Sequence, residues 1–216
     1  MRLPIVKSLQ LGNFEVLGLE DRIVGMNSLK NIFDSKIRQQ MDEEKTVKIG
    51  KEGNFDLDTV IAIRPEYIFV SASKHGGFEA LLESGIPIIT HHGYKETNPL
   101  GQAEWIKLIG LLTGETRRAN AVFADIETKY LKLKDEVHGM IGTKAKPTVA
   151  SGRQIRDGWY IVGGQSYLAQ IFEDAGADYV MADNEESGGG TLDFEEAFAK
   201  SVNADFWQID GAYDGD

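Results

Sequence analysis

Residues 115–138, ETRRANAVFADIETKYLKLKDEVH, decide how the chain is organised. Apolar side chains recur there at spacings of three and four, as on one face of an α-helix, at Val122, Ile126, Tyr130, Leu133 and Val137. At 1.5 Å per residue such a helix is roughly 36 Å long, about the diameter of a domain. The stretch therefore predicts a long helix that joins two halves of the chain.

Short β-branched runs alternate with helical patterns on both sides of this helix. Strands are predicted at residues 22–26, 46–49, 67–71, 86–90, 147–150, 159–162, 179–181 and 205–209. Further helices are predicted at residues 28–41, 56–62, 78–83, 103–112, 166–175 and 193–200, with N-caps at Asn27 or Ser28, at Asp56 and at Ser166. Such alternation is typical of parallel sheets covered by helices.

This alternation predicts an α/β protein with two Rossmann-like lobes, whose parallel sheets are joined by the long inter-lobe α-helix. We expect the N-terminal α/β lobe at residues 1–99, the helical linker at residues 100–142 and the C-terminal α/β lobe at residues 143–216. The cleft between two lobes is the expected place for a small ligand.

The composition excludes several classes of protein. The net charge is −11 at pH 7, so binding to nucleic acid is not expected. The chain has no cysteine, which excludes disulfides and thiolate-bound metal. No apolar run approaches the roughly 18 residues of a membrane span. The first residues, MRLPIVKSLQLGNF, lack the apolar core of a secretion leader.

Six stretches, in order along the chain, carry a resemblance to a known family. They are LGLEDRIVGMN, FDLDTVIAIRPEYIFVSAS, LLESGIPIIT, NPLGQAEWIKLIGLLTGE, GGQSYLAQIFEDAGADYV and DFEEAFAKSVNADFW. The chain resembles the periplasmic substrate-binding proteins of ABC importers for iron complexes, haem and vitamin B12, which have a helical backbone between their lobes.

The resemblance implies a function in uptake rather than catalysis. It implies an extracytoplasmic binding component that captures a ferric siderophore, or alternatively haem or cobalamin, and delivers it to an ABC permease with its ATPase. It also implies a monomer without a resident cofactor, in the periplasm or on the outer face of the cell envelope, and lipid-anchored in the full-length form. Family members carry a leader and continue for several βα elements beyond residues 205–209, so we expect a second lobe that is incomplete here.

Candidate ligand contacts in the first lobe follow two predicted strands, where open α/β sheets bind their ligands. Lys74 is a candidate to pair with an anionic ligand, and His75 to ligate a metal or haem iron; a solvated loop is the alternative. One of His91 and His92, or Tyr94, is a candidate contact after the next strand; ordinary polar loop residues are the alternative. Because adjacent residues of an extended segment point to opposite sides, His91 and His92 are not expected to chelate one metal ion.

Candidate contacts in the second lobe lie within residues 151–160. Arg153 and Arg156 are candidates to hold carboxylate or catecholate oxygens, because a guanidinium donates in a planar fork. Trp159 and Tyr160 are candidates to stack on a flat ligand, with a core role for one of them as the alternative. By resemblance, Glu79 and Glu195 are the exposed glutamates that dock to permease arginines; ordinary solvated helix starts are the alternative.

The sequence argues against two other classes of function. A small-molecule enzyme on the same frame would need a catalytic motif, and the chain has no G-x-S-x-G, no HExxH and no EF-hand loop. A receptor for free zinc or manganese would need three or four converging ligands, and the four histidines are poorly clustered along the chain. We therefore expect neither a catalytic residue nor a metal site.

Overall fold

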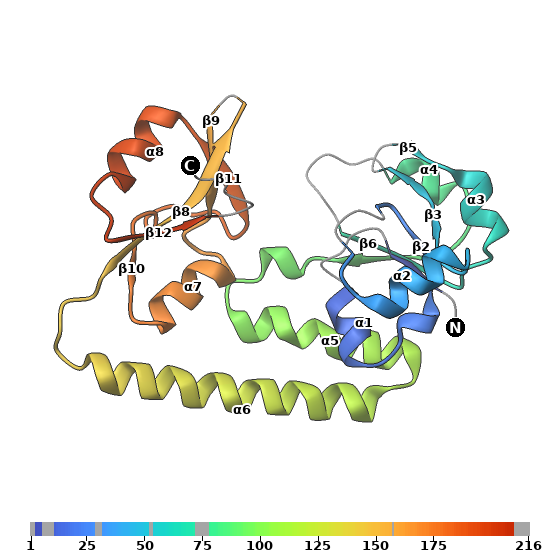
Figure 1. Cartoon of the computed structure of the whole chain (residues 1–216), viewed down its shortest axis with the longest axis horizontal. Coiled ribbons are helices and arrows are strands. Elements are labelled where there is room, and N and C mark those ends of the chain that lie inside the picture. Colours follow the sequence, from blue (N-terminus) through green and yellow to red (C-terminus); the bar gives the residue numbers. More distant parts are fainter. Residues whose placement is uncertain are drawn as a thin grey trace. The chain divides into compact units, whose positions relative to one another are not determined.

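The structure is a computed structural model that describes residues 3–5, 11–28, 32–51, 54–71, 78–156 and 158–209. The chain divides into two compact units (Figure 1). Unit 1 comprises residues 1–92 and 105–122, and unit 2 comprises residues 93–104 and 123–216.

Unit 1 is built on a parallel sheet of five strands in the order β3-β2-β1-β6-β7. Its elements before the long helices are β1 (Leu3–Ile5), α1 (Leu11–Val16), η2 (Glu20–Arg22), β2 (Ile23–Met26), α2 (Ser35–Asp42), β3 (Val47–Lys48), β4 (Gly50–Lys51), β5 (Asn54–Phe55), α3 (Leu57–Ala62), β6 (Ile68–Ser71), α4 (Glu79–Leu82) and β7 (Ile88–His91). All residues of β2 and β6 are buried, as expected for strands that are covered on both faces. The predicted parallel sheet of the first lobe is confirmed.

Helix starts in unit 1 follow the capping side chains. Asp56 caps α3 as predicted, because its carboxylate accepts a hydrogen bond from the Thr59 amide at 3.0 Å. The predicted start of α2 near Ser28 is wrong. Asp34 caps that helix by accepting from the Ile37 amide at 2.7 Å, and Ile37 is fully buried. Asn27, Ser28 and Asp34 are all polar residues that can cap a helix. Asp34 is the one used, because the helix that starts there buries Ile37.

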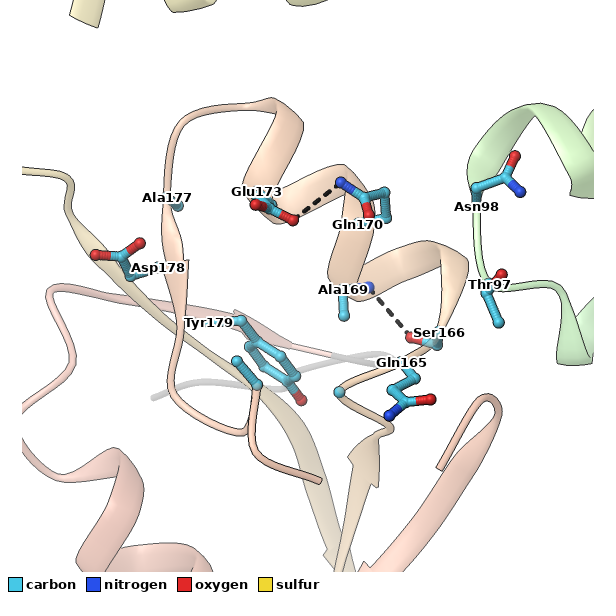
Figure 2. Close-up of a pocket in the computed structure, with 12 residues that line it drawn as sticks. Thr97, Asn98, Gln165, Ser166, Ala169, Gln170, Glu173, Ala177, Asp178 and Tyr179 are labelled. Carbon is cyan, nitrogen blue, oxygen red and sulfur yellow. Dashed lines mark hydrogen bonds between the residues drawn. The ribbon is translucent and has the colours of Figure 1, made fainter. Parts of the chain in front are cut away.

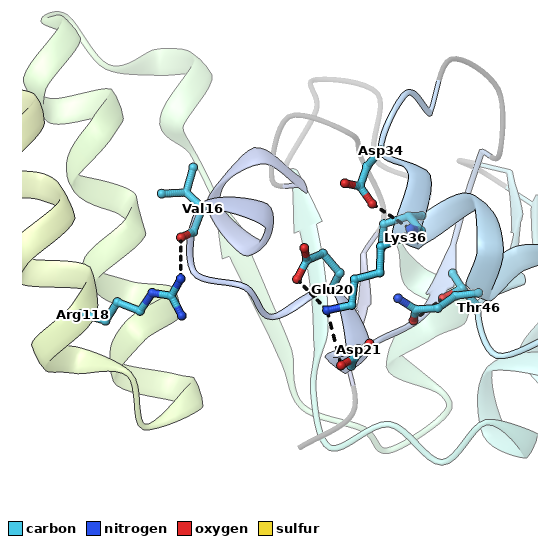
Figure 3. Close-up of polar contacts among 9 residues, drawn as sticks. Val16, Glu20, Asp21, Asp34, Lys36, Thr46 and Arg118 are labelled. Atoms are coloured by element: carbon cyan, nitrogen blue, oxygen red, sulfur yellow. Dashed lines mark hydrogen bonds and ion pairs between the residues drawn. The ribbon is translucent and has the colours of Figure 1, made fainter.

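Polar contacts also join the elements of unit 1 (Figure 3). Lys36 of α2 lies 3.3 Å from the Glu20 carboxylate and 3.4 Å from that of Asp21, both in η2. Arg118 donates a hydrogen bond to the Val16 carbonyl at the end of α1, at 3.3 Å. These contacts attach α1, η2 and α2 to neighbouring parts of the same unit.

Two helices, α5 (Pro99–Thr113) and α6 (Thr116–Ile141), each contribute residues to both units. The predicted long helix is therefore confirmed, but the predicted apolar stripe is wrong in part. Leu133 is 59% exposed and Ile126 is 36% exposed, whereas Phe123 is buried and Tyr130 is half-buried. Apolar residues lie on more than one side of α6, so their spacing alone does not identify the packed side.

Unit 2 contains η3 (Gly93–Lys95), β8 (Thr148–Ile155), β9 (Gly158–Val162), α7 (Tyr167–Asp174), β10 (Asp178–Tyr179), β11 (Gly189–Leu192), α8 (Phe194–Ser201) and β12 (Phe206–Ile209). β10 and β12 pair in parallel with β8, while β9 is antiparallel to β8 and to β11. The α/β class is as predicted, but this sheet is mixed rather than wholly parallel. The link between β8 and β9 is too short for a parallel crossover and permits only a hairpin.

Helices α7 and α8 of unit 2 cover opposite faces of its parallel strands (Figure 1). Tyr179 of β10 packs against Phe172 of α7, with ring centroids 5.2 Å apart. On the other face, Trp159 lies 6.0 Å from Phe194 of α8 and 5.5 Å from Trp207 of β12. The core between these layers is apolar and includes the fully buried Ile161 and Met181 together with Ala169 and Ala197.

Candidate functional site

Of the candidates of the first lobe, the structure describes His91, in unit 1, and Tyr94, in unit 2. Lys74 and His75 lie outside the described residues. His91 is fully buried, and its ring centroid is 4.4 Å from that of Trp105. Burial, with a smaller contribution from His92, lowers the pKa of His91 to about 4, so the imidazole is neutral at pH 7. Its burial argues against direct contact with a ligand. His92 is exposed, consistent with two neighbouring histidines that point to opposite sides.

Two candidates meet in unit 2, and Tyr94 also belongs to this unit. Arg153 of β8 and Tyr160 of β9 are directly opposite each other in the hairpin. The Arg153 side chain lies over the Tyr160 ring, with its guanidinium carbon 6.0 Å from the ring centroid. Arg153 is exposed and Tyr160 is half-buried. A guanidinium held against a phenol ring presents a planar donor and an aromatic hydroxyl side by side.

Two neighbouring glycines each lie against a tyrosine. A Cβ added at Gly189 would lie 2.0 Å from the Tyr160 hydroxyl oxygen, so the ring rests directly on this glycine. A Cβ at Gly188 would lie 3.6 Å from the ring of Tyr94. Tyr94 and Tyr160 therefore contact neighbouring glycines. We call this set, Tyr94, Arg153, Tyr160, Gly188 and Gly189, the tyrosine–glycine face.

Tyr167, at the first position of α7, borders the tyrosine–glycine face and was not among the predicted site residues. Its amide donates to the Glu96 carbonyl at 2.8 Å, which fixes the start of α7 beside the segment that carries Tyr94. Burial raises the pKa of Tyr167, and the neighbouring Tyr160 adds to the shift. The sequence offered one signal for this position, namely the glycine pair and Ser166 just before it.

Arg156 and Trp159 are not part of the tyrosine–glycine face. Arg156 is exposed at the end of the β8–β9 hairpin. Trp159 alternates with Tyr160 along β9, so its side chain points to the opposite face of the sheet. There it packs on Phe194 and Trp207, which supports the core role that was the alternative for one of the two aromatic residues.

A separate hollow of about 760 Å³ surrounds the start of α7 (Figure 2). Ser166 caps this helix as predicted, by accepting a hydrogen bond from the Ala169 amide at 3.1 Å. The side chains of Asn98, Gln165 and Gln170 also line the hollow. Its charged lining residues are the acidic Glu173 and Asp178. The tyrosine–glycine face therefore suits an anionic ligand better than this hollow does, because Arg153 supplies a positive charge there.

The remaining candidates are acidic. Glu79 begins α4 in unit 1, Glu195 lies in the first turn of α8 in unit 2, and both are exposed.

Within the described ranges, no group of three or more histidine, aspartate or glutamate residues is arranged to hold a metal ion. In the same part of the chain, no helix combines the length and hydropathy needed to cross a membrane.

The chain belongs to the family described as Periplasmic binding protein, whose profile matches residues 5–212. This confirms the resemblance found in the sequence. An uncharacterized lipoprotein of Methanocaldococcus jannaschii is 26% identical over 219 residues, which cover 96% of this chain and 51% of the lipoprotein. The chain thus spans about half the length of the relatives it matches.

Solved structures share the fold. A protein of the Fe³⁺-hydroxamate transport system from Saccharomonospora viridis superposes with a TM-score of 0.74 and 18% identity, over 98% of this chain and 75% of that one. A periplasmic haem-binding protein of Vibrio cholerae superposes with a TM-score of 0.73 and 14% identity, over 98% of this chain and 76% of that one. At these identities the likeness concerns the fold alone.

Proposed function

We propose that the chain is the ligand-binding part of an extracytoplasmic component of an ABC importer, and that its ligand is a ferric siderophore. The observation that carries the ligand class is the tyrosine–glycine face, where Arg153 lies against Tyr160 and Tyr94 approaches the same glycine segment. Membership of the periplasmic binding protein family supports the transport role. Binding and release without chemical conversion is the activity proposed.

The chemistry of the face suits a ferric chelate. Carboxylate, catecholate or hydroxamate oxygens of such a chelate accept hydrogen bonds, and a guanidinium donates two of them in one plane. The phenol groups of Tyr94 and Tyr160 add donors on an aromatic surface. The structure from Saccharomonospora viridis, which is named for Fe³⁺-hydroxamate transport, is consistent with this ligand class.

Haem is the second candidate ligand, and a specific observation favours it. Tyr160 adds to the raised pKa of Tyr167, and Tyr94 lies near Gly188, next to the glycine on which Tyr160 rests. A group of tyrosines offers both flat contact area and a hard oxygen ligand for ferric iron. The similar structure from Vibrio cholerae is named as a haem-binding protein.

Equilibrium titrations of the 216-residue chain with ferrioxamine B, haemin and cyanocobalamin test the ligand class, with tryptophan quenching and visible absorbance as readouts. We expect saturable binding of ferrioxamine B. Arg153→Gln should weaken it about 10- to 100-fold, the loss expected for a charge-assisted hydrogen bond of about 1.5–3 kcal/mol. Arg156→Gln, an exposed arginine outside the tyrosine–glycine face, is the matched control and should leave affinity within a factor of two or so.

Three outcomes contradict the siderophore proposal. Saturation by haemin alone, with a Soret shift that Tyr160→Phe or Tyr94→Phe removes, would assign the site to haem. Saturation by cyanocobalamin alone would assign it to a corrinoid. Equal losses for Arg153→Gln and Arg156→Gln would show that overall charge, not the arrangement on Tyr160, attracts the chelate.

We further propose that Glu79 and Glu195 dock the chain to arginines of a permease. Both side chains are exposed, and each belongs to a different unit. Charge reversal to arginine should reduce ligand-dependent stimulation of the transporter's ATPase in proteoliposomes, because like charges would then face each other. Glu83→Arg and Glu196→Arg, at neighbouring exposed positions, are the matched controls. Stimulation that is reduced equally by the controls would contradict the docking role.

The setting of the protein follows from the same proposal. We propose that it acts as a monomer on the outer side of the cell membrane and is held there by a lipid anchor in the full-length form. The relative from Methanocaldococcus jannaschii, which is named as a lipoprotein, supports the anchor. Metabolic labelling with a fatty acid, followed by purification, tests this. A full-length protein that carries no label would exclude a lipid anchor.

A further inference from the structure

The backbone just before α7 continues the antiparallel ladder of β9 and β11 beyond the ends of those strands. The Gly163 amide donates a hydrogen bond to the Gly188 carbonyl at 2.7 Å, and the Gln165 amide donates to the Glu186 carbonyl at 3.1 Å. Both pairs keep the register in which β9 and β11 are paired. This ladder therefore fixes the glycine segment of the tyrosine–glycine face to the start of α7.

Two glycines before α7 permit this close approach. A Cβ added at Gly163 would lie 2.1 Å from the Glu186 carbonyl oxygen, and one added at Gly164 would lie 2.4 Å from the Met181 carbonyl oxygen. These neighbours are backbone atoms, which cannot turn aside as the end of a flexible side chain can. A larger residue at either position would therefore push the start of α7 away from the segment that carries Gly188.

The next alternate amide of the same stretch is bound to a different part of the chain. The Tyr167 amide donates to the Glu96 carbonyl at 2.8 Å. A Cβ added at Gly188 would lie 3.6 Å from the Tyr94 ring and 3.7 Å from the Tyr94 carbonyl oxygen. Residues 163–167 thus join the segment that carries Tyr94 to the segment that carries Gly188, and both segments belong to the tyrosine–glycine face.

Ser166 lies between these two sets of hydrogen bonds and is 3% exposed. Its hydroxyl accepts a hydrogen bond from the Ala169 amide at 3.1 Å, which closes the first turn of α7 (Figure 2). Its own amide donates to the Gly163 carbonyl at 3.1 Å, which closes the turn before the helix. Loss of the hydroxyl would remove the acceptor of the Ala169 amide and loosen the first turn, which begins at Tyr167.

We propose that Ser166 is a positioning residue of the tyrosine–glycine face: by holding the first turn of α7 closed, it sets the place of Tyr94 relative to Gly188 and Tyr160. This inference rests on the function proposed above, because it concerns the same ligand site. A ligand that contacts both tyrosines binds more tightly when their spacing is fixed before it arrives, because ordering side chains on binding costs affinity. Ser166 acts through α7 and has no contact with the ligand in this proposal.

The test compares wild type with Ser166→Ala, with Ser166→Thr, which keeps a capping hydroxyl, and with Asp56→Ala as the matched control. Asp56 caps α3 in unit 1, where its carboxylate accepts from the Thr59 amide at 3.0 Å. Ser166→Ala and Asp56→Ala should both lower the Tm, because each removes one N-cap. Well below the Tm, only Ser166→Ala should weaken binding of ferrioxamine B, by about 3- to 10-fold, and Ser166→Thr should stay within about twofold of wild type.

A second measurement needs no ligand. In NOE spectra of the isotopically labelled chain, the ring protons of Tyr94 should show cross-peaks to the α-protons of Gly188, because the two residues are in contact. We expect these cross-peaks in wild type, Ser166→Thr and Asp56→Ala, and their weakening or loss in Ser166→Ala. A substitution that only lowered stability would leave the contact intact in the folded chain.

Three results would overturn the proposal. Unchanged cross-peaks in Ser166→Ala would show that Ser166 does not place Tyr94. Equal losses of affinity in Ser166→Ala and Asp56→Ala, or no loss in either while wild type binds, would leave Ser166 with a purely structural role. If wild type binds neither ferrioxamine B nor haemin nor cyanocobalamin, the proposed function fails, and the NOE comparison still decides whether Ser166 sets the position of Tyr94.

Discussion

A buried carboxylate between α6 and α7 gives the most direct test of the packing in unit 2. Asp174 is 7% exposed. Its oxygens accept from the Tyr130 hydroxyl at 2.6 Å and from the Gln170 amide at 2.9 Å, and Lys134 lies at 2.9 Å. Burial by itself raises the pKa of Asp174, but hydrogen bonds from Tyr130, Lys134 and Gln170 together hold it below its usual value. The charged form is therefore favoured in the folded state.

Asp174→Asn should lower the free energy of unfolding by about 2–3 kcal/mol at pH 7. A hydrogen bond to a charged group contributes about 1.5–3 kcal/mol, and removing one member of a buried pair costs about 3–5 kcal/mol. The expected loss is below the 3–5 kcal/mol of a fully buried pair, because the Lys134 side chain is 34% exposed and solvent screens its attraction to Asp174. In urea unfolding followed by tryptophan fluorescence, with m near 2 kcal/mol per M, the midpoint should fall by about 1 M.

The stability difference between the wild type and Asp174→Asn should depend on pH with a definite sign. Because the folded pKa of Asp174 is depressed, its contribution is complete well above the unfolded value of about 3.9. The contribution is lost as the pH falls through the lower folded pKa. Asp125→Asn is the control, because its pair with Lys129 is exposed and should contribute less than about 0.5 kcal/mol. Equal effects of the two substitutions, or a difference that does not change between pH 7 and pH 3, would refute the reasoning.

Two further predictions concern unit 1 and the long helix. Gly110→Ala should lower the free energy of unfolding by about 1–3 kcal/mol despite the better helix propensity of alanine, because a Cβ there would lie 2.4 Å from the Cβ of Ala119. Gly139→Ala, where an added Cβ would meet no atom outside its own stretch of helix, should instead raise it by up to about 1 kcal/mol, and thermal melts of both variants check the contrast. Burial, with a smaller contribution from His92, lowers the pKa of His91 to about 4, so the stability it contributes is present above about pH 6.5 and is lost as the pH falls towards 4. In urea titrations between pH 7 and pH 4, the stability of the wild type should fall relative to that of His91→Phe as the pH falls, and parallel curves would show that His91 does not titrate with unfolding.

Local sequence was sufficient for several elements. Asp56 and Ser166 predicted their helix starts correctly, because a short polar side chain caps an amide of its own first turn without help from distant residues. The long helix was predicted at 115–138 and is found at Thr116–Ile141, since a sustained apolar period without glycine or proline has few alternatives. These predictions rest on interactions within a few residues of chain.

Tertiary structure decided which of several compatible local choices is used. The apolar residues of α6 left more than one side available, and packing selected the side with Tyr130 while Leu133 stayed exposed. The tyrosine–glycine face likewise needs Tyr94 and Tyr160, far apart in the chain, to lie against two neighbouring glycines that carry no signal of their own. The periodicity of a sequence shows how side chains repeat along one helix or strand. Which side of that element is buried, and against what, depends on the shapes of surfaces that distant segments contribute.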